Sequence, residues 1–575
     1  MKNYYGLVSL PILIKKPIVK FNRLKKLPGI VLLFFSVVHL IYAQENTLLI
    51  QTSSKQDSII LSKINYQKQF PDANSLNLEL DSVLNQVHLL GFIEALWIDK
   101  KHISNQTSVS LLLGKPYQGL ILYSKSALLT DEIKQKLNIQ DSIQLNFQAL
   151  GTYLEGKKEK LNQLGYPFAV VKASHLIKKD EFIYGELLII PNEKRNINAF
   201  VIKGYTSFPK NFLKQISKKY KHLTFSEQNL IQLNKELNTL RFVRQTKNPE
   251  VLFNTDSTQV YLYLEKSKSN RFDGLLGATT NKEGNTILNG YVDLLLINAF
   301  NKGEQLSVYW KNNGEEQKTF NLSGNFPYVF KTPLGFRGDL NIFSEGKSFQ
   351  NTKIGSAVDY YFNFNSNLFI GYEKNQSSTI QNTSVLTQDF ESYFYSIGYH
   401  YKRLFEENWT ENWQTRIKFG NGVRTSTTQK STQQLLDVYL EKNIVLHALH
   451  QINVRTNHFI LFSDDFLTNE LYRFGGINSI RGFNENSLQA NQAHSLLTEY
   501  RFFFSNKSYL HTVTDYGYAY DRTIEAINTF KSFGFGIGLQ SKSGLMQLIY
   551  ANGTAGNQSF NISNSIVHVG FKSSF

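Results

Sequence analysis

The second half of the chain alternates apolar and polar positions with a period of two. In Ser392–Lys402 every second residue from Tyr393 to Tyr401 is tyrosine or isoleucine, and the residues between them are mainly small or polar. In Ser532–Gln540 phenylalanine, isoleucine and leucine alternate in the same way with serine, glycine and glutamine. This pattern predicts β-strands with two unlike faces. The aromatic load on one face favours a lipid-facing wall around a polar lumen over a water-soluble sandwich.

Residues 269–575 divide into about sixteen such strands, at roughly 19 residues per strand and connection. All eleven prolines lie at or before Pro333, and proline cannot donate to a strand ladder, so the proline-free remainder suits a continuous sheet. We therefore expect a transmembrane antiparallel β-barrel. Its expected strands include Thr286–Ala299, Gln305–Asn313, Gly335–Phe343, Trp413–Arg424, Leu435–Leu446, His494–Phe504, Tyr509–Asp521 and Ile566–Phe575.

The first half follows a different pattern, in which the end of an amphipathic helix, a glycine or arginine, an aromatic residue and a strand recur three times. The matched positions are Gly91, Gly165 and Arg241, separated by 74 and 76 residues. Glycine after a helix adopts the left-handed conformation at low cost, and Arg241 departs from that rule. We predict three α+β modules, each ordered strand–helix–helix–strand–strand. Their predicted bounds are 44–116, 117–194 and 195–268.

Charge separates the N-terminal segment from the rest of the chain. Residues 1–27 hold seven lysines and arginines and no acid, and Pro28–Ala43 is uncharged. This apolar run is shorter than the about 20 residues that a membrane-spanning helix needs. We predict a secretory signal over 1–43, cleaved after Ala43, with an uncleaved membrane anchor as the alternative.

The formal net charge of +16 at first points to nucleic acid. Seven of these charges lie in the predicted signal, a net +8 lies in Gln44–Lys268, and a net +1 lies in the remaining 307 residues. The balanced second half removes the support for a nucleic-acid partner. The chain has no cysteine, which excludes disulfides, thiolate zinc sites and cysteine nucleophiles.

Enzymatic interpretations find little support in the sequence. The glycines of Gly534–Gly538 alternate with apolar residues and so indicate a strand instead of a dinucleotide loop. His447 and His450 lie three residues apart in an expected strand, which would place them on opposite faces and prevent them from sharing a metal. No Ser/His/Asp constellation stands out. We predict no catalytic residue, no metal ligand and no cofactor.

One loop motif carries the identification. Arg473–Phe483 reads RFGGINSIRGF and lies between two expected strands. In the strands that follow, alternation directs Glu499 and Asp515 to the lumen side. A loop arginine that folds into the lumen, Arg481, could pair with either carboxylate through charge-assisted hydrogen bonds, which are stronger than neutral ones.

With these features the chain resembles the BamA/TamA superfamily, barrel proteins with POTRA modules that include two-partner secretion transporters. The resemblance covers nearly the whole mature chain: three repeats, a sixteen-strand barrel, the motif and the Asp515-Tyr516-Gly517 element. It implies that Arg481 contacts Asp515 first and Glu499 second, and it assigns a C-terminal targeting signal to Gly570, Phe571 and Phe575. Ser573 departs from the hydrophobic residue usual at its position. The loop motif comprises Ser479, Ile480, Arg481, Gly482 and Phe483.

The resemblance implies a factor of the bacterial outer membrane, with its modules in the periplasm, that assembles or exports other proteins without hydrolysis. Its expected partners are unfolded outer-membrane or secreted clients, the lipid bilayer and a possible periplasm-spanning protein. In the assembly branch the first and last strands, here about Phe272–Asn281 and Ile566–Phe575, pair weakly and open. Three modules favour a TamA-like layout over the five-module general factor. The alternative is a two-partner-secretion-type transporter that exports one large exoprotein; such transporters usually have two modules. A passive porin would not explain the repeats or the motif.

Overall fold

The computed structural model describes residues 46–574, with gaps at 104, 125–128, 222, 281–285, 314–316, 382–385, 404–412, 506–507 and 542–543. The predicted signal over 1–43 and the terminal Phe575 lie outside the described residues. The chain forms two compact units: residues up to Ile197 with short pieces near Asn229 and Thr258, and most of the remainder. In the described part of the chain, no helix combines the length and the apolar character needed to span a membrane.

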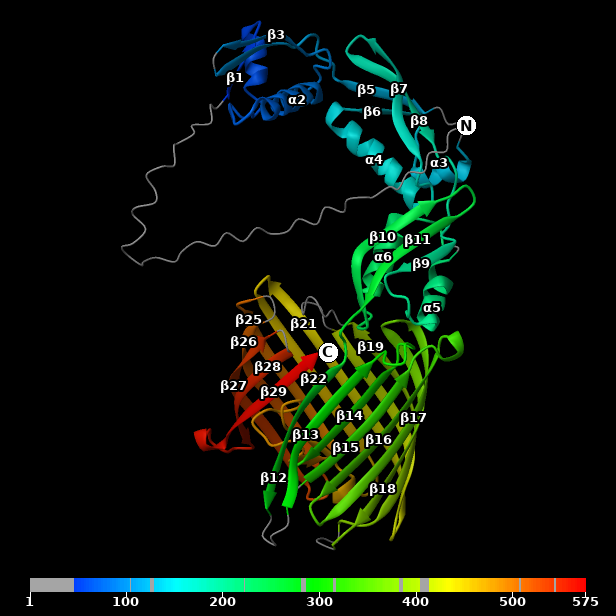
Figure 1. Ribbon diagram of the computed structural model, residues 1–575, viewed down its shortest axis with the longest axis vertical. Helices are drawn as coiled ribbons and strands as arrows, with labels where there is room; N and C mark the ends of the chain where they lie inside the picture. The colour runs from blue at the N-terminus through cyan, green and yellow to red at the C-terminus, as the bar shows by residue number, and fades with distance from the viewer. Residues whose placement is uncertain are drawn as a thin grey trace, which may run out of the picture. The chain divides into compact units, whose positions relative to one another are not determined.

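The first unit holds two α+β modules of similar build (Figure 1). Each has a four-stranded sheet, of order β2-β1-β4-β3 or β6-β5-β8-β7, in which β1 runs parallel to β4 and β5 runs parallel to β8. The elements are β1 (Asn46–Thr52), α1 (Lys55–Leu61), β2 (Gln69–Phe70), α2 (Ala73–Leu89), β3 (Leu96–Ile103) and β4 (Gln106–Leu112), then β5 (Gly119–Ser124), α3 (Asp131–Leu137), β6 (Ser142–Leu145), α4 (Phe147–Gln163), β7 (Val170–Lys179) and β8 (Phe182–Ile190).

Helix α2 shows how the repeated sequence directs this fold. Asp72 caps the helix by accepting the N–H of Ser75 at 2.7 Å. Leu76, Leu80, Val83 and Val87, one helical stripe, are buried against the sheet. Gly91 and Gly165 follow α2 and α4 with φ of +105° and +96°, the left-handed conformation expected of a glycine there. A Cβ at Gly91 would lie 2.3 Å from the carbonyl oxygen of Tyr117, so the position also requires a close approach.

A third set of elements leads into the barrel and lies mostly in the second unit. It has the predicted order of one strand, two helices and two strands, and its sheet has the order β10-β11-β9. The first two modules differ from that prediction, because each has a short extra strand between its helices: β2 with two residues and β6 with four. Such short strands leave no alternation to detect. The elements are β9 (Ala199–Lys203), α5 (Lys210–Tyr220), α6 (Glu227–Leu237), β10 (Val243–Phe253) and β11 (Thr258–Lys266).

Sixteen antiparallel strands form a closed barrel, as the alternation predicts (Figure 1). In β26 inward positions are buried and outward positions are exposed along most of the strand. The barrel strands are β12 (Arg271–Thr280), β13 (Thr286–Ile297), β14 (Gln305–Asn312), β15 (Gln317–Phe326), β16 (Leu334–Glu345), β17 (Phe349–Asn363), β18 (Ser366–Thr379), β19 (Phe390–Arg403), β20 (Trp413–Ser426), β21 (Lys430–His447), β22 (His450–Phe462), β25 (Gln492–Phe503), β26 (Tyr509–Asp521), β27 (Ala526–Gln540), β28 (Gly544–Ala555) and β29 (Ser565–Ser574).

The barrel closes through a short seam between its first and last strands. Among the described residues, strand β12 pairs with β29 at two positions, Arg271 with Ser574 and Phe272 with Ser573. On its other side β12 pairs with β13 continuously from Arg271 to Thr280. Because ladder hydrogen bonds accumulate with pairing length, the seam is the weakest junction of β12.

One sequence-based argument is wrong. His447 and His450 do not lie in one strand: β21 ends at His447, β22 begins at His450, and the two residues pair across the hairpin with ring centroids 6.1 Å apart. The sequence HALH contains no glycine, proline or asparagine to mark this turn. Among the described residues no group of three or more His, Asp or Glu side chains could hold a metal ion.

Candidate functional site in the barrel lumen

A long segment between β22 and β25, residues 463–491, is here called the connector. It contains the 3₁₀ helix η4 (Thr468–Glu470) and a two-stranded sheet of β23 (Tyr472–Phe474) and β24 (Leu488–Ala490), separate from the barrel ladder. The predicted motif lies in the connector. Gly475 and Gly476 have φ of +100° and +97°, and the N–H of Ser479 donates to the carbonyl of Gly476 at 3.0 Å. These glycines allow the turn that directs Arg481 toward the wall.

The structure brings Arg481 together with Asp515 of β26. Arg481 Nε donates to Asp515 Oδ2 at 2.9 Å and Nη2 donates to Oδ1 at 2.5 Å, a bidentate pair. The backbone N–H of Arg481 also donates to Asp515 Oδ2, at 3.0 Å. Both side chains are 0% exposed. Asp515 therefore fixes both the guanidinium and the backbone of the loop.

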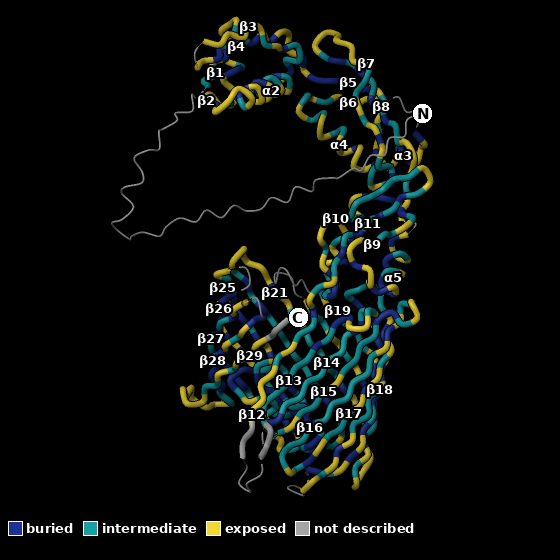
Figure 2. The backbone as a smooth tube through the Cα atoms, viewed as in Figure 1, coloured by how far each residue is buried: buried dark blue, intermediate teal, exposed yellow. Residues whose placement is uncertain are grey.

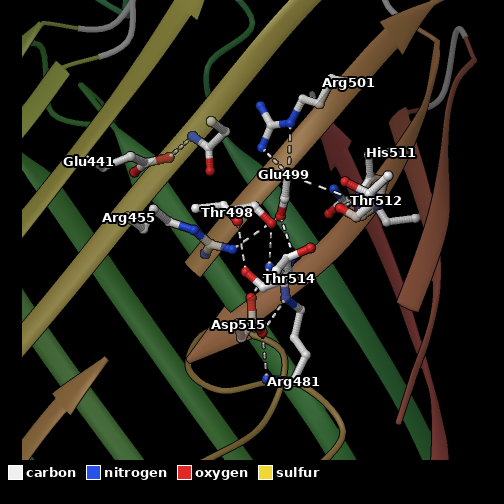
Figure 3. A network of polar contacts seen from close by, with 12 residues as sticks. Glu441, Arg455, Arg481, Thr498, Glu499, Arg501, His511, Thr512, Thr514 and Asp515 are labelled. Atoms are coloured by element: carbon white, nitrogen blue, oxygen red, sulfur yellow. Dashed lines mark hydrogen bonds and ion pairs between the residues drawn. The ribbon is translucent and has the colours of Figure 1, made fainter. Parts of the chain in front are cut away.

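Glu499 of β25 is the centre of a larger network (Figure 3). Its Oε1 accepts from Arg481 Nη1 and from Arg455 Nη2, the latter at 3.2 Å. Its Oε2 accepts from Arg501 Nε at 2.8 Å and from Arg501 Nη2 at 2.5 Å. Three guanidinium groups thus share two buried carboxylates. Removing one member of such a network leaves the others as incompletely compensated charges in a poorly solvated place.

The neighbours of Arg481 in the motif fit the wall closely. Ile480 is fully buried, and a Cβ added at Gly517 would lie 2.2 Å from Ile480 Cδ1. Gly517 therefore makes room for the loop two residues after Asp515. Gly482 has φ of +81°, and a Cβ there would lie 2.5 Å from the backbone nitrogen of Gly553 in β28. Phe483 packs edge-on against Phe530 of β27, with ring centroids 5.5 Å apart. Buried positions are frequent along β25 to β28 (Figure 2).

The sequence reasoning missed a second buried arginine, Arg424 on β20. Its side chain is 0% exposed; Nη1 donates to Glu470 Oε1 at 2.6 Å and Nη2 donates to Asp465. Here the cation belongs to the wall and the acids belong to the connector, the reverse of the Arg481 arrangement. The sequence did offer a signal for this pair. Arg424 lies on the lumen-facing side of an expected strand, and the acids Asp465 and Glu470 lie at the start of the connector.

Two further ion pairs hold the connector to other strands, and the sequence did not indicate either. Arg473 forms a bidentate pair with Glu345 of β16, in which Nη1 lies 2.9 Å from Oε1 and Nη2 lies 2.5 Å from Oε2. Glu485 pairs with Lys311 of β14 and accepts the hydroxyl of Tyr309 at 3.0 Å. The connector is thus anchored to strands on several parts of the wall.

The predicted C-terminal signal lies on β29. Val567, Val569 and Phe571 are exposed on the outward face. A Cβ added at Gly570 would meet nothing within 4 Å. Phe575 lies outside the described residues, so the last residue of the predicted signal has no structural account.

Comparison with known proteins rests on structure alone. No protein-family model matches the sequence. No curated protein matches it either. CdiB from Escherichia coli superposes with a TM-score of 0.51 at 13% identity, covering 91% of this chain and 99% of that one.

Two other solved structures are similar over most of the chain. CdiB from Acinetobacter baumannii gives a TM-score of 0.49 at 13% identity over 81% of this chain and 91% of that one. BamA from Haemophilus ducreyi lacking POTRA domains 1–3 gives 0.46 at 13% identity over 80% and 100%. The likeness to the Escherichia coli protein concerns the fold. The chain therefore shares the fold of that CdiB structure, a sixteen-stranded barrel preceded by α+β modules.

Proposed function

We propose that this protein is a bacterial outer-membrane factor that captures client proteins on its POTRA-like modules and inserts or exports them through its barrel. The observation that carries this proposal is the seam, where the described residues of β12 and β29 share two pairs. A wall that is closed this weakly can exchange the β12–β29 pairing for pairing with a client strand. No nucleotide is needed, because the client's own strand pairing and apolar burial supply the free energy.

The modules offer edges at which an extended client could add a strand. Strands β3 and β7 are edge strands of their sheets. Ile103 on β3 and Leu176 and Ile177 on β7 are exposed. An edge strand presents unpaired backbone groups, and apolar side chains beside them give a client further surface to bury. We place these modules in the periplasm and the barrel in the outer membrane.

The connector supports the same mechanism through its position. Its arginine network joins it to β25 and β26, and its other ion pairs reach β14, β16 and β20. These anchors leave the seam strands free of ion pairs to the connector among the described residues. Opening of the seam would therefore not require any of these buried pairs to break.

A second candidate is export of one large partner protein through the lumen. The superposition with Escherichia coli CdiB, over 91% of this chain, is the observation that keeps this candidate. The third set of α+β elements, β9 to β11, favours assembly, because two modules are usual in two-partner secretion transporters.

Depletion of the protein in its own organism distinguishes the two candidates. The outer-membrane and secreted proteomes are compared before and after depletion, with a depleted porin as the control for general envelope damage. Loss of several barrel proteins supports assembly, and loss of a single large exoprotein supports secretion. If both proteomes stay unchanged, both candidates are wrong.

A further inference from the structure

The turn between β13 and β14, residues 298–304, is unusually well braced for a hairpin turn. The buried Glu304 accepts the N–H of Phe300 at 2.5 Å and the N–H of Lys302 at 3.0 Å. Asn298 Oδ1 accepts the N–H of Gly303 at 2.7 Å. The braced turn nevertheless presents Phe300 with 64% of its surface exposed. The bracing therefore fixes the backbone from which the exposed Phe300 ring projects.

The next turn at the same rim, residues 327–333 between β15 and β16, exposes a second phenylalanine. Tyr328, Phe330 and Lys331 all have positive φ, of 54°, 52° and 60°. Residues with a Cβ seldom adopt this conformation, and such strain tends to occur at functional positions. In this backbone conformation Tyr328 is buried against Phe212, with ring centroids 4.9 Å apart, and Phe330 is left 93% exposed.

A groove of about 740 Å³ lies between these two turns and the start of α5. This volume falls within the about 300–1,000 Å³ usual for small-molecule sites. Lys210, Lys302 and Lys331 line the groove, and its described lining contains no acidic residue. The apolar part of the lining comprises Phe208, Phe300, Phe326, Pro327, Tyr328, Val329 and Phe330.

One residue of the lining, Asn211, is held by the backbone of both turns. Asn211 is 9% exposed; its Nδ2 donates to the carbonyls of Lys302 and Pro327, at 2.7 and 3.0 Å, which fixes the orientation of the amide. Asn211 Oδ1 and Asn301 Oδ1 are buried and have no donor among the described residues.

The groove adjoins the outward face of the barrel wall. Leu334 and Phe336 on β16 are exposed and follow Phe330 by four and six residues. The apolar lining therefore continues the lipid-facing surface at the rim where α5 packs on the barrel. Aromatic rings beside lysines are the usual residues at the level of lipid headgroups.

We propose that this groove binds one glycerophospholipid of the leaflet on the module side. Phe300 and Phe330 contact the acyl chains at the end next to the headgroup. The phosphate is bound by Lys210, Lys302 and Lys331. A lipid fits the groove better than a peptide does, because the groove opens beside the membrane surface and joins apolar lining to three lysines that form no ion pair among the described residues. This binding site is independent of the client that the barrel handles.

The bound lipid would touch the parts that hold α5 to the barrel. Asn211 binds the backbone of both turns, and Gln215 Nε2 donates to the carbonyls of Lys331 and Thr332 at 3.0 and 3.2 Å. Phe212 fills the space beside Gly303, where a Cβ would lie 2.0 Å from its ring. The lipid would therefore stabilise this helix on the rim.

Quenching by brominated lipid tests the position of Phe330. The full-length protein is reconstituted into vesicles of phosphatidylcholine and phosphatidylglycerol in which the phosphatidylglycerol carries bromine in its upper acyl chains. In Phe330→Trp, the emission of the introduced tryptophan should fall by at least half. The control is Phe560→Trp, at a position that is 58% exposed in the loop before β29, and its introduced tryptophan should keep its emission. Equal quenching of the two variants would overturn the proposal.

Lipid retention tests the lysines. Lys210→Gln/Lys302→Gln/Lys331→Gln is compared with a control that removes the same charge from exposed lysines of the first module, Lys55→Gln/Lys63→Gln/Lys68→Gln. Native mass spectrometry of the detergent-purified proteins should show about tenfold less retained phosphatidylglycerol in the groove variant only. Two results would contradict a phospholipid site. One is retention of phosphatidylglycerol equal to that of the control variant. The other is displacement of the retained lipid by inorganic phosphate while the quenching of Phe330→Trp by brominated lipid persists.

Discussion

Arg481 and Asp515 are joined by three hydrogen bonds, two from the guanidinium and one from the backbone N–H of Arg481. The Asp515 carboxylate accepts from the guanidinium and from the backbone N–H of Arg481, and so it fixes both the place of the loop backbone and the direction of the arginine side chain. This relationship makes Asp515 the main anchor of the motif on β26.

Arg481→Ala should release the motif from the wall. The substitution leaves Asp515 buried without its guanidinium partner, and breaking a buried pair costs about 3–5 kcal/mol. We expect the connector to become sensitive to added protease while the barrel still migrates as a folded, heat-modifiable band. Arg481→Lys should give an intermediate result, because lysine keeps the charge and loses the bidentate geometry. An unchanged cleavage pattern and unchanged client assembly would show that the anchor is unimportant.

Gly482→Ala should displace the same loop for a steric reason. The new Cβ would lie 2.5 Å from the Gly553 nitrogen at a φ of +81°. The combined clash and strain should cost about 1–3 kcal/mol, seen as a lower unfolding temperature. Gly338→Ala is the matched control, because its nearest atom would be 3.8 Å away. Equal unfolding temperatures for the two variants would contradict the close approach of the loop to β28.

Arg424→Ala should loosen the first part of the connector and leave the motif in place. Glu470 would lose its buried partner, and hydrogen exchange should rise in residues 463–470 while residues 479–483 stay protected. Because Arg424 and Arg481 share no partner, the loss of unfolding free energy in the double variant should equal the sum of the single losses within about 0.5 kcal/mol. A strongly non-additive result would mean that the two anchors form one unit.

Locking the seam should stop client assembly. The chain has no cysteine, so Phe272→Cys/Ser573→Cys introduces a single disulfide across the β12–β29 pair. The control, Phe272→Cys/Leu294→Cys, locks the same residue to its partner in β13. We expect the seam lock alone to reduce client assembly, and a reductant to restore it. Full activity of the oxidised seam variant would exclude opening at this junction.

The contact between the first two modules should weaken in acid. Lys178 Nζ lies 2.5 Å from Glu94 Oε1, and this hydrogen bond is the main cause of the lowered pKa of Glu94. The pKa of Glu94 is lower in the folded chain than in the unfolded one. The contact therefore stabilises the folded chain fully at pH values above the ordinary carboxylate pKa, and this stabilisation is lost as the pH falls through the pKa of Glu94 in the folded chain.

Spin labels placed in α2 and β7 of the full-length protein can measure this change. Their distance distribution should broaden at low pH in the native chain. Glu94→Gln should show the broad distribution already at neutral pH and should not respond to acid. A pH response retained by that variant would assign the change to another group.

The fold could be predicted largely from the sequence because a barrel wall has a two-residue period. Strand β26 was expected at Tyr509–Asp521 and has those bounds, since its tyrosines and small residues alternate without interruption. The strand expected over Leu435–Leu446 extends from Lys430 to His447 instead, because the added N-terminal residues Lys430–Gln434 are polar on both faces and show no alternation. The turn before His450 was missed for lack of any turn residue.

The connector shows what a strand pattern leaves out. The Arg481 motif has a recognisable order of residues, and the acids near it were detectable as charges on lumen-facing positions. Arg424, Glu345 and Lys311 also occupy such positions, but their partners lie 46, 128 and 174 residues away. Only the closure of the barrel and the path of one irregular segment bring them together, and neither has a period in the sequence.

The anchors of the connector also bear on how the tube can deform. The connector forms ion pairs with β14, β16, β20, β25 and β26. Because these strands are spread over most of the barrel wall, the connector should keep this part of the barrel from changing its cross-section. In the described part of the chain, its ion pairs end on none of β12, β13, β27, β28 and β29. The connector still packs on β28 through Gly482 and on β27 through Phe483. Bending should therefore concentrate at β12 and β13 beside the seam, where β12 and β29 could part while the braced sector keeps its shape.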